Sequence, residues 1–217
     1  MLIGIVGLIS SGKDTVAERL VREYNFKKDS FAKSLKDAVS SIFNWDRKML
    51  EGKTNESRAW REQPDIFWSK KFGKDVTPRW VLQHFGTEVM RQNMHDAIWI
   101  DSCLARYKGK PTVISDTRFE NEIKTIRESG GKIILVKRGQ DPDWFTSYVE
   151  DNIQPTGIHS SEYAWAKSEF DYVIKNDGTL EELYQLVDEL IVSNKITNTP
   201  SQPTDTAQPL TVSTNSL

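Results

Sequence analysis

The apolar and polar positions at the start of the chain predict a strand, a loop and a helix. Four of the five residues in Leu2–Val6 are large and apolar, and a glycine-bounded loop follows at residues 7–12. Val16, Leu20 and Tyr24 then recur at helical spacing. This order indicates a parallel α/β arrangement that begins with its first strand.

The same alternation of short apolar runs with amphipathic segments continues to about residue 191. Further strands are expected at 26–31, 112–116, 132–136 and 172–174. Helices are expected at 31–42, 77–91, 97–107, 119–129 and 180–191. We therefore predict an α/β fold with a mostly parallel five-stranded sheet in three α/β/α layers.

Residues 45–75 mix tryptophan and phenylalanine with arginine and lysine. Interleaved aromatic and basic side chains are typical of single-stranded nucleic-acid binding. Acidic residues in the same stretch offset that charge, namely Asp46, Glu51, Glu56, Glu62 and Asp65. We therefore favour a helical insertion that buries its tryptophans. The insertion is expected to cover about residues 45–108.

The composition narrows the class of protein. Its 217 residues carry a net charge of −2, which argues against a general nucleic-acid coat. There is no apolar run of membrane-spanning length, and the single cysteine, Cys103, excludes a disulfide framework, so a cytoplasmic location is expected. Residues 1–195 are expected to form one domain, and the polar segment 196–217 a disordered tail.

The loop at residues 7–15, GLISSGKDT, has the chemistry of a phosphate cradle. Glycines allow backbone N–H groups to converge on a polyphosphate, and the following helix adds the positive end of its dipole. Lys13 supplies a mobile cation for the β- and γ-phosphates. Asp14 replaces the usual hydroxyl after the lysine, which favours kinases of small metabolites over GTPases and motors. An ordinary turn is disfavoured because a strand precedes the loop and a helix follows it.

A second candidate group lies at the end of another strand. Residues 112–116 end in Asp116, and Arg118 follows directly. In a parallel sheet this edge binds ligands, so Asp116 is a candidate to orient the waters of Mg²⁺. The alternative is a capping aspartate beside a surface arginine. The histidines show no metal-ligand spacing, so no protein ligand to a metal is expected.

Seven segments together resemble the phage deoxynucleoside monophosphate kinases, which have a P-loop NTPase fold. In chain order they are GLISSGKDT (7–15), FAKSLKDA (31–38), TPRWVLQHFGTEVMR (77–91), IWID (98–101), ISDTRFENE (114–122), HSSE (159–162) and DYVIKNDGTLEEL (171–183). The resemblance implies transfer of the ATP γ-phosphate to a dNMP with Mg²⁺ as cofactor, in dNTP supply for phage DNA synthesis in the host cytoplasm.

The resemblance also implies roles for individual residues. Lys13, Asp116 and Arg118 would be catalytic. ATP would be bound by Gly7, Ser10, Ser11, Gly12, Lys13, Asp14, Thr15 and Arg138. The monophosphate would be bound by Leu35, Lys36, Arg79, Gly86, Thr87, Arg91, Trp99, Arg118 and Glu122. Mg²⁺ would rest on phosphates and water, with Asp116 near it, and residues 138–170 would form a lid.

Two alternatives remain beside this expectation. One is a kinase of another small phosphorylated metabolite, since phosphomevalonate kinase resembles the chain in its GKDT-type loop and its SDTR strand end. The other is a non-catalytic P-loop protein that binds nucleotide or DNA. The expected partners are ATP and a dNMP, with no nucleic acid and no membrane, and a homodimer is left open.

Overall fold

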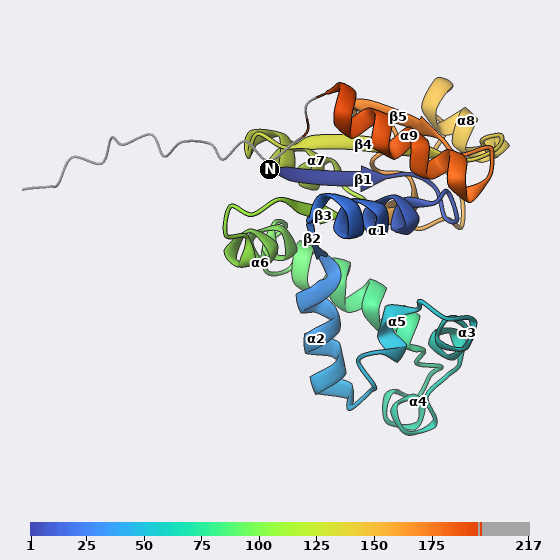
Figure 1. Cartoon of the computed structure of the whole chain (residues 1–217). Coiled ribbons are helices and arrows are strands. Elements are labelled where there is room, and N and C mark those ends of the chain that lie inside the picture. Colours follow the sequence, from blue (N-terminus) through green and yellow to red (C-terminus); the bar gives the residue numbers. More distant parts are fainter. Residues whose placement is uncertain (195, 197–217) are drawn as a thin grey trace, which may run out of the picture.

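A parallel sheet of five strands carries the fold in the computed structural model, which describes residues 1–194 and 196 (Figure 1). The strands are β1 (Leu2–Val6), β2 (Lys27–Asp29), β3 (Thr112–Ile114), β4 (Lys132–Lys137) and β5 (Tyr172–Lys175). Their order is β2-β3-β1-β4-β5, and all four pairings are parallel. The carboxyl ends of the strands therefore meet at one edge, as the sequence predicts.

Helices cover both faces of the sheet and form the predicted three layers (Figure 1). One face packs against α1 (Lys13–Tyr24) and α9 (Leu180–Ser193), and the other against α7 (Glu120–Glu128). Every residue of β1 is buried because the strand is covered on both sides. Gly4 allows α7 to come close, since a Cβ there would lie 2.6 Å from the side chain of Ile126.

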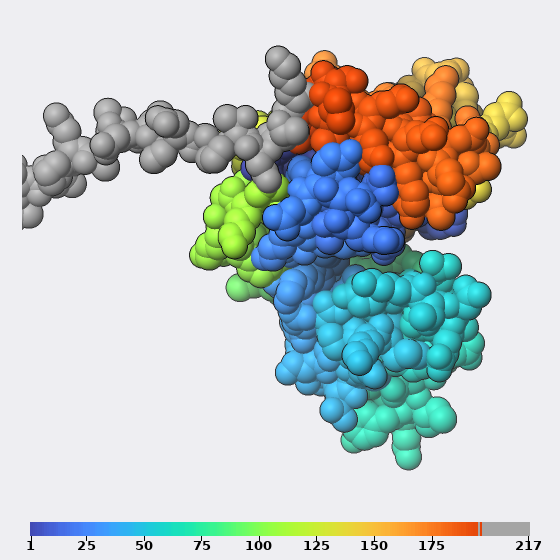
Figure 2. All heavy atoms as spheres, viewed as in Figure 1, coloured from blue at the N-terminus to red at the C-terminus, as the bar shows by residue number. Residues whose placement is uncertain are grey.

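Most of the remaining helices form a lobe beside the sheet (Figure 2), and the insertion expected at about residues 45–108 falls within it. The segments from the sheet into this lobe and back are α2 (Ala32–Phe43), η1 (Met49–Glu51), α3 (Asn55–Glu62), α4 (Ile66–Phe72), α5 (Pro78–His84), η2 (Phe85–Gln92) and α6 (Ile98–Arg106). The lobe stands away from the core at the carboxyl edge of the strands, and Figure 2 shows a notch between the two.

The aromatic residues of the insertion pack against one another, as the sequence analysis favoured. The ring of Trp45 stacks on Phe43 at 4.6 Å and meets Trp60 edge-on at 6.0 Å. The indole N–H of Trp45 donates to Asp65, and that of Trp68 donates to the carbonyl of Phe43. The tryptophans therefore contribute to the packing of the lobe.

The predicted helix at 77–91 is irregular in its second half. Thr77 caps α5 and Pro78 occupies its first turn, but residues 85–92 form the π-helical segment η2. This segment brings the side chain of Arg91 into the protein, where it is 8% exposed. π-Helical turns are frequent at functional sites.

The segment 138–170, the predicted lid, contains α8 (Asp143–Glu150) and η3 (Ser160–Glu162). Its tryptophans pack into the core on the α7 face of the sheet. Ile196 is buried against α9, and the rest of the predicted tail lies outside the described residues. Within residues 1–194 and 196, no helix is long and apolar enough to cross a membrane.

Candidate active site

The phosphate loop connects β1 to α1 and is held in shape by close neighbours. Gly7 has a φ of +146°, and a Cβ there would lie 2.3 Å from the carbonyl oxygen of Val136. Gly12 has a φ of +105°, and a Cβ there would lie 2.5 Å from the amide nitrogen of Asn176. Both positions therefore require glycine, because the backbone is left-handed there and a neighbour lies close.

Asn176 supports the phosphate loop from the end of the last strand, a role that the sequence motifs do not assign to it. It follows β5 and is 6% exposed. Its side-chain amide donates to the carbonyl of Ser11 at 2.8 Å, and its backbone N–H donates to Lys137 at 2.7 Å. Asn176 thus ties the phosphate loop to the last strand. A polar residue directly after an expected strand is the only sequence signal for it.

Lys13 lies inside the curve of the loop. Its Nζ donates to the carbonyls of Gly7 at 2.8 Å and Leu8 at 2.7 Å. Burial lowers the pKa of Lys13 to about 8, and the positive charge of Arg118 acts in the same direction. Lys13 and Arg118 are therefore close enough to repel each other, and a bound anion would relieve that repulsion.

This lowered pKa predicts proton uptake when ATP binds. At about pH 8.5 a large share of Lys13 is neutral in the free protein, and bound phosphates favour the ammonium form. Titration calorimetry in two buffers of different ionisation enthalpy is expected to show uptake near pH 8.5 and less at about pH 7. Loss of the difference in a Lys13→Met variant would assign it to Lys13, and equal uptake in both proteins would contradict the assignment.

Asp14 is held by the ends of two neighbouring strands. Its carboxylate accepts hydrogen bonds from Lys28 at 2.8 Å and Ser115 at 2.9 Å. Burial raises the pKa of Asp14, but the hydrogen bonds from Lys28 and Ser115 outweigh that effect and keep it below its usual value. Asp14 is therefore ionised, and its side chain remains 76% exposed beside Lys13.

Asp116 caps the start of α2. It accepts from the hydroxyl of Ser30 at 2.7 Å and from the N–H groups of Phe31 at 3.1 Å and Ala32 at 3.0 Å. This is the capping role that the sequence analysis left open as an alternative. It also places a carboxylate at the end of β3, so a role in ordering the waters of Mg²⁺ stays a prediction.

Arg118 is held by the lid segment. Its guanidinium donates to Glu162 at 2.6 Å and to the hydroxyl of Ser161 at 3.3 Å. His159 accepts a hydrogen bond from the backbone N–H of Ser161 through its Nδ1 and thereby shapes the turn. The HSSE segment at 159–162 therefore binds the guanidinium of Arg118. Arg118 and Glu162 are 44 residues apart, so no local pattern reveals this interaction.

Glu122 and Arg91 form a buried ion pair beneath this arginine. Glu122 is 2% exposed and accepts from Arg91 and from the backbone N–H groups of Arg118 and Phe119. Burial raises the pKa of Glu122 to about 7, although the charge of Arg91 opposes this. The guanidinium of Arg91 also lies 4.3 Å from the ring centre of Phe119. The pair links η2 to the turn that carries Arg118.

Three of the predicted monophosphate residues pack against one another. A Cβ on Gly86 would lie 2.8 Å from the side chain of Leu35, and the indole of Trp99 donates to the Gly86 carbonyl. The close neighbour that requires glycine is therefore a side chain of the core. Trp99 is 6% exposed and Leu35 8%, so their contact with substrate stays a prediction.

The other predicted contacts lie nearer the surface. Lys36 pairs with Glu51 at 2.8 Å. Arg79 pairs with Glu62. Thr87 is half-buried in η2, and Arg138 is exposed at the end of β4. The structure thus gathers the donor-loop residues closely, and it distributes the predicted acceptor residues over the insertion and the end of β3.

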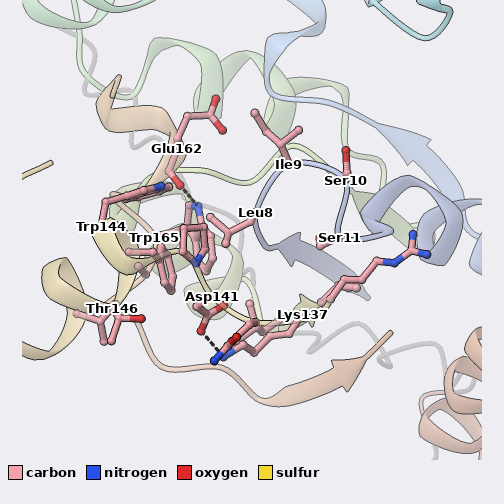
Figure 3. A pocket seen from close by; sticks show the side chains of 18 of the residues that line it. Leu8, Ile9, Ser10, Ser11, Lys137, Asp141, Trp144, Thr146, Glu162 and Trp165 are labelled. Carbon is pink, nitrogen blue, oxygen red and sulfur yellow. Dashed lines mark hydrogen bonds and ion pairs between the residues drawn. The ribbon is translucent and has the colours of Figure 1, made fainter. Parts of the chain in front are cut away.

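A cavity of about 700 Å³ opens beside the phosphate loop (Figure 3). Leu8 forms its wall on the loop side, and Trp144 and Trp165 of the lid segment lie opposite. Arg138 and Glu162 also line it. The lid segment therefore presents an apolar surface to the loop, which is suited to excluding water.

The carboxylates near the phosphate loop differ in how much of their surface is left free. Among the described residues, no three His, Cys, Asp or Glu side chains are grouped as metal ligands. Asp116 is occupied by three donors, whereas Asp14 leaves carboxylate surface open next to Lys13. Mg²⁺ on phosphate oxygens and water stays a prediction.

Comparison with known proteins gives the family. The family model described as deoxynucleotide monophosphate kinase matches residues 52–187. A protein of Acanthamoeba polyphaga mimivirus, provisionally named deoxynucleotide monophosphate kinase, is 31% identical over 86% of this chain and 94% of its own. The deoxynucleoside-5'-monophosphate kinase of Escherichia phage T5 is 26% identical, over 59% of this chain and 72% of its own.

Solved structures give a more distant similarity. Shikimate kinase from Aquifex aeolicus is 14% identical, with a TM-score of 0.45 over 91% of this chain and 100% of that chain. The sequence comparisons give the family. The family model matches more than half of the chain, and the mimivirus protein aligns with 86% of it. The chain belongs to the deoxynucleotide monophosphate kinase family.

Proposed function

We propose that this kinase transfers the γ-phosphate of MgATP to the phosphate of a deoxynucleoside monophosphate, giving ADP and a dNDP. The observation that carries the proposal is the position of Arg118. Its charge acts on Lys13 of the donor loop and also on Arg61 of the insertion. Arg118 follows the end of β3 and pairs with Glu162 at 2.6 Å, so a single arginine is within electrostatic reach of the donor loop and of the insertion.

Phosphoryl transfer to a phosphate depends on charge neutralisation and on substrate positioning more than on a general base. The acceptor phosphate is already a dianion and can attack directly, so no residue needs to remove a proton. Lys13 and Arg118 would neutralise the charge on the transferring group, and Mg²⁺ bound with ATP supplies further neutralisation. Asp14 and Asp116 are the carboxylates that would order the waters of that ion. The apolar wall of the lid would exclude bulk water and suppress hydrolysis.

Glu162 would act as a counter-charge that gives way to substrate. Before the acceptor binds, its carboxylate satisfies Arg118 at 2.6 Å. A phosphate dianion offers more charge and more acceptor oxygens, so it would take over the guanidinium. The same exchange would release the HSSE segment and allow the lid to move with the substrate.

We expect Arg118→Ala to lower kcat by ~100-fold, because an interaction that is strongest in the transition state is lost. The Kd for ATP is expected to stay near its wild-type value, since the donor loop is untouched. Steady-state kinetics and direct ATP binding measure the two effects. Arg22→Ala, an exposed change on α1, is the control. Wild-type kcat in Arg118→Ala would show that the acceptor site lies elsewhere.

A substrate panel tests the proposal against the alternative of a kinase for another small phosphorylated metabolite, such as phosphomevalonate. ADP formation is followed with dGMP, dTMP, dCMP, dAMP, the matching ribonucleotides and phosphomevalonate. We expect turnover with at least one deoxynucleotide and none with phosphomevalonate. Turnover with phosphomevalonate alone would reject the proposal. Tight binding of single-stranded DNA without ADP formation would support the non-catalytic alternative.

A further inference from the structure

The turn at residues 176–178, between β5 and α9, packs against the phosphate loop. Asn176 is 6% exposed, and its side-chain amide donates to the carbonyl of Ser11 at 2.8 Å. The same amide nitrogen would lie 2.5 Å from a Cβ on Gly12. The carbonyl and the N–H of a trans peptide point in opposite directions. Asn176 therefore fixes the direction of the Gly12 N–H as well as that of the Ser11 carbonyl.

The same turn holds the backbone on both sides of Arg138. The N–H of Asn176 donates to the carbonyl of Lys137 at 2.7 Å. The carboxylate of Asp177 accepts from the N–H of Gly139 at 2.6 Å. Gly139 has a φ of +64°, so the chain turns sharply where the lid segment begins. Arg138 stands between these two hydrogen bonds and therefore leaves the sheet in a fixed direction.

Arg138 and the phosphate loop face the same cavity. Ser11 and Arg138 both line the space of about 700 Å³ beside the loop (Figure 3). Arg138 is exposed, so its long side chain has conformational freedom to lose when it binds a ligand. A fixed backbone reduces that loss, because part of the ordering has already taken place before binding. The turn thus holds the two walls of the cavity in one frame.

We propose that Asn176 and Asp177 are positioning residues for ATP, which keep the phosphate loop and Arg138 at a fixed separation. The proposal rests on the proposed function for the identity of the ligand. It gives roles to two residues to which neither the sequence motifs nor the resemblance assigned any. Both act through other groups, since Asn176 binds the Ser11 carbonyl and Asp177 the Gly139 N–H. The triphosphate would then meet Arg138 without rearrangement of the backbone.

Two variants of Asp177 test the link to Arg138 through the Kd for MgATP, measured by titration calorimetry without an acceptor. Asp177→Ala and Asp177→Asn lose the same charge, but asparagine keeps an oxygen that can accept from Gly139. We expect Asp177→Ala to bind ATP ~3–10-fold more weakly than Asp177→Asn, as for the loss of one hydrogen bond.

The same pair is then compared in an Arg138→Met background. There the two variants should bind ATP equally, because the side chain that Asp177 positions is absent. A purely structural contact would weaken binding by the same factor with or without Arg138. A difference that persists unchanged in Arg138→Met, or no difference in either background, would overturn the proposal.

Asn176→Asp tests the link to the phosphate loop. Aspartate has the size of asparagine but cannot donate to the Ser11 carbonyl, so the Kd for MgATP should rise ~10-fold. Asn194→Asp is the matched control, because it removes a bond of the same kind, from a side-chain amide to the Leu190 carbonyl at 2.9 Å, at the exposed end of α9. Its Kd should equal that of wild type. A wild-type Kd in Asn176→Asp would contradict the proposal, and the Asp177 pair decides if Asn176→Asp does not fold.

These binding measurements separate the inference from the proposed function, because they contain no dNMP. If ATP binding changes as expected but no dNMP is phosphorylated, the positioning role stands and the proposed function fails. If a dNMP is phosphorylated while the Asn176 and Asp177 variants bind ATP as wild type does, the proposed function stands and the inference is wrong.

Discussion

Lys13→Met is expected to lower kcat by ~1000-fold or more, because the transferring phosphoryl group loses the one cation of the donor loop. The side chain is aimed into the curve of the loop, where it donates to the carbonyls of Gly7 and Leu8. Bound phosphates would replace those carbonyls as acceptors. Methionine keeps the length and the apolar stem of the side chain, so the loop is expected to stay folded. A coupled assay of ADP formation measures the effect.

Lys124→Met serves as the matched control. Lys124 lies on α7 with 73% of its side chain exposed and pairs only weakly with Glu128 at 3.9 Å. Its kcat should equal that of wild type. If Lys13→Met retained more than about a tenth of wild-type kcat, the loop could not be the donor site that this chemistry requires.

Glu122→Ala is expected to reduce the free energy of unfolding by about 3–5 kcal/mol, because it leaves a buried arginine without its counter-charge. Arg91 has 7% of its side chain exposed and cannot reach water without rearrangement of η2. Two backbone N–H groups, those of Arg118 and Phe119, also lose their acceptor. Urea unfolding followed by circular dichroism measures the change.

Two companion variants identify the cause. Glu122→Gln keeps an acceptor oxygen and should cost less than Glu122→Ala. In the double variant Arg91→Met/Glu122→Ala no charge is buried, so it should be more stable than Glu122→Ala alone. Arg91→Met alone completes the comparison. If the double variant loses as much free energy of unfolding as Arg91→Met and Glu122→Ala lose together, the ion pair does not couple η2 to the turn.

Features specified by short segments could be predicted from the sequence. The first strand ends at Val6, as predicted, and a capping box of Thr179 and Glu182 starts α9, within the helix predicted at 180–191. Thr77 and Pro78 start α5, at the beginning of the helix predicted at 77–91. Each of these depends on residues within four positions of one another, so a local pattern contains the information. The family resemblance is confirmed by the match to residues 52–187.

Features specified by packing between distant segments could not be predicted. The ion pair of Arg118 with Glu162 joins positions 44 residues apart. The hydrogen bond from the Asn176 amide to the Ser11 carbonyl joins positions 165 residues apart. The π-helical form of η2 goes with the burial of Arg91 against Glu122, which periodicity alone does not reveal. Arg61 lies in a segment whose composition favours plain helical packing. In each case the two residues come together only after the chain has folded, because they belong to segments that are distant in sequence.

The most direct test follows the phosphoryl group itself. The protein is mixed with MgATP labelled on the γ-phosphate and with dGMP, dTMP, dCMP or dAMP, and the products are separated by thin-layer chromatography. The account predicts label in a deoxynucleoside diphosphate, in amounts equal to the ADP formed, and loss of that product in Lys13→Met. Label released only as inorganic phosphate, with every deoxynucleotide unchanged, would contradict it.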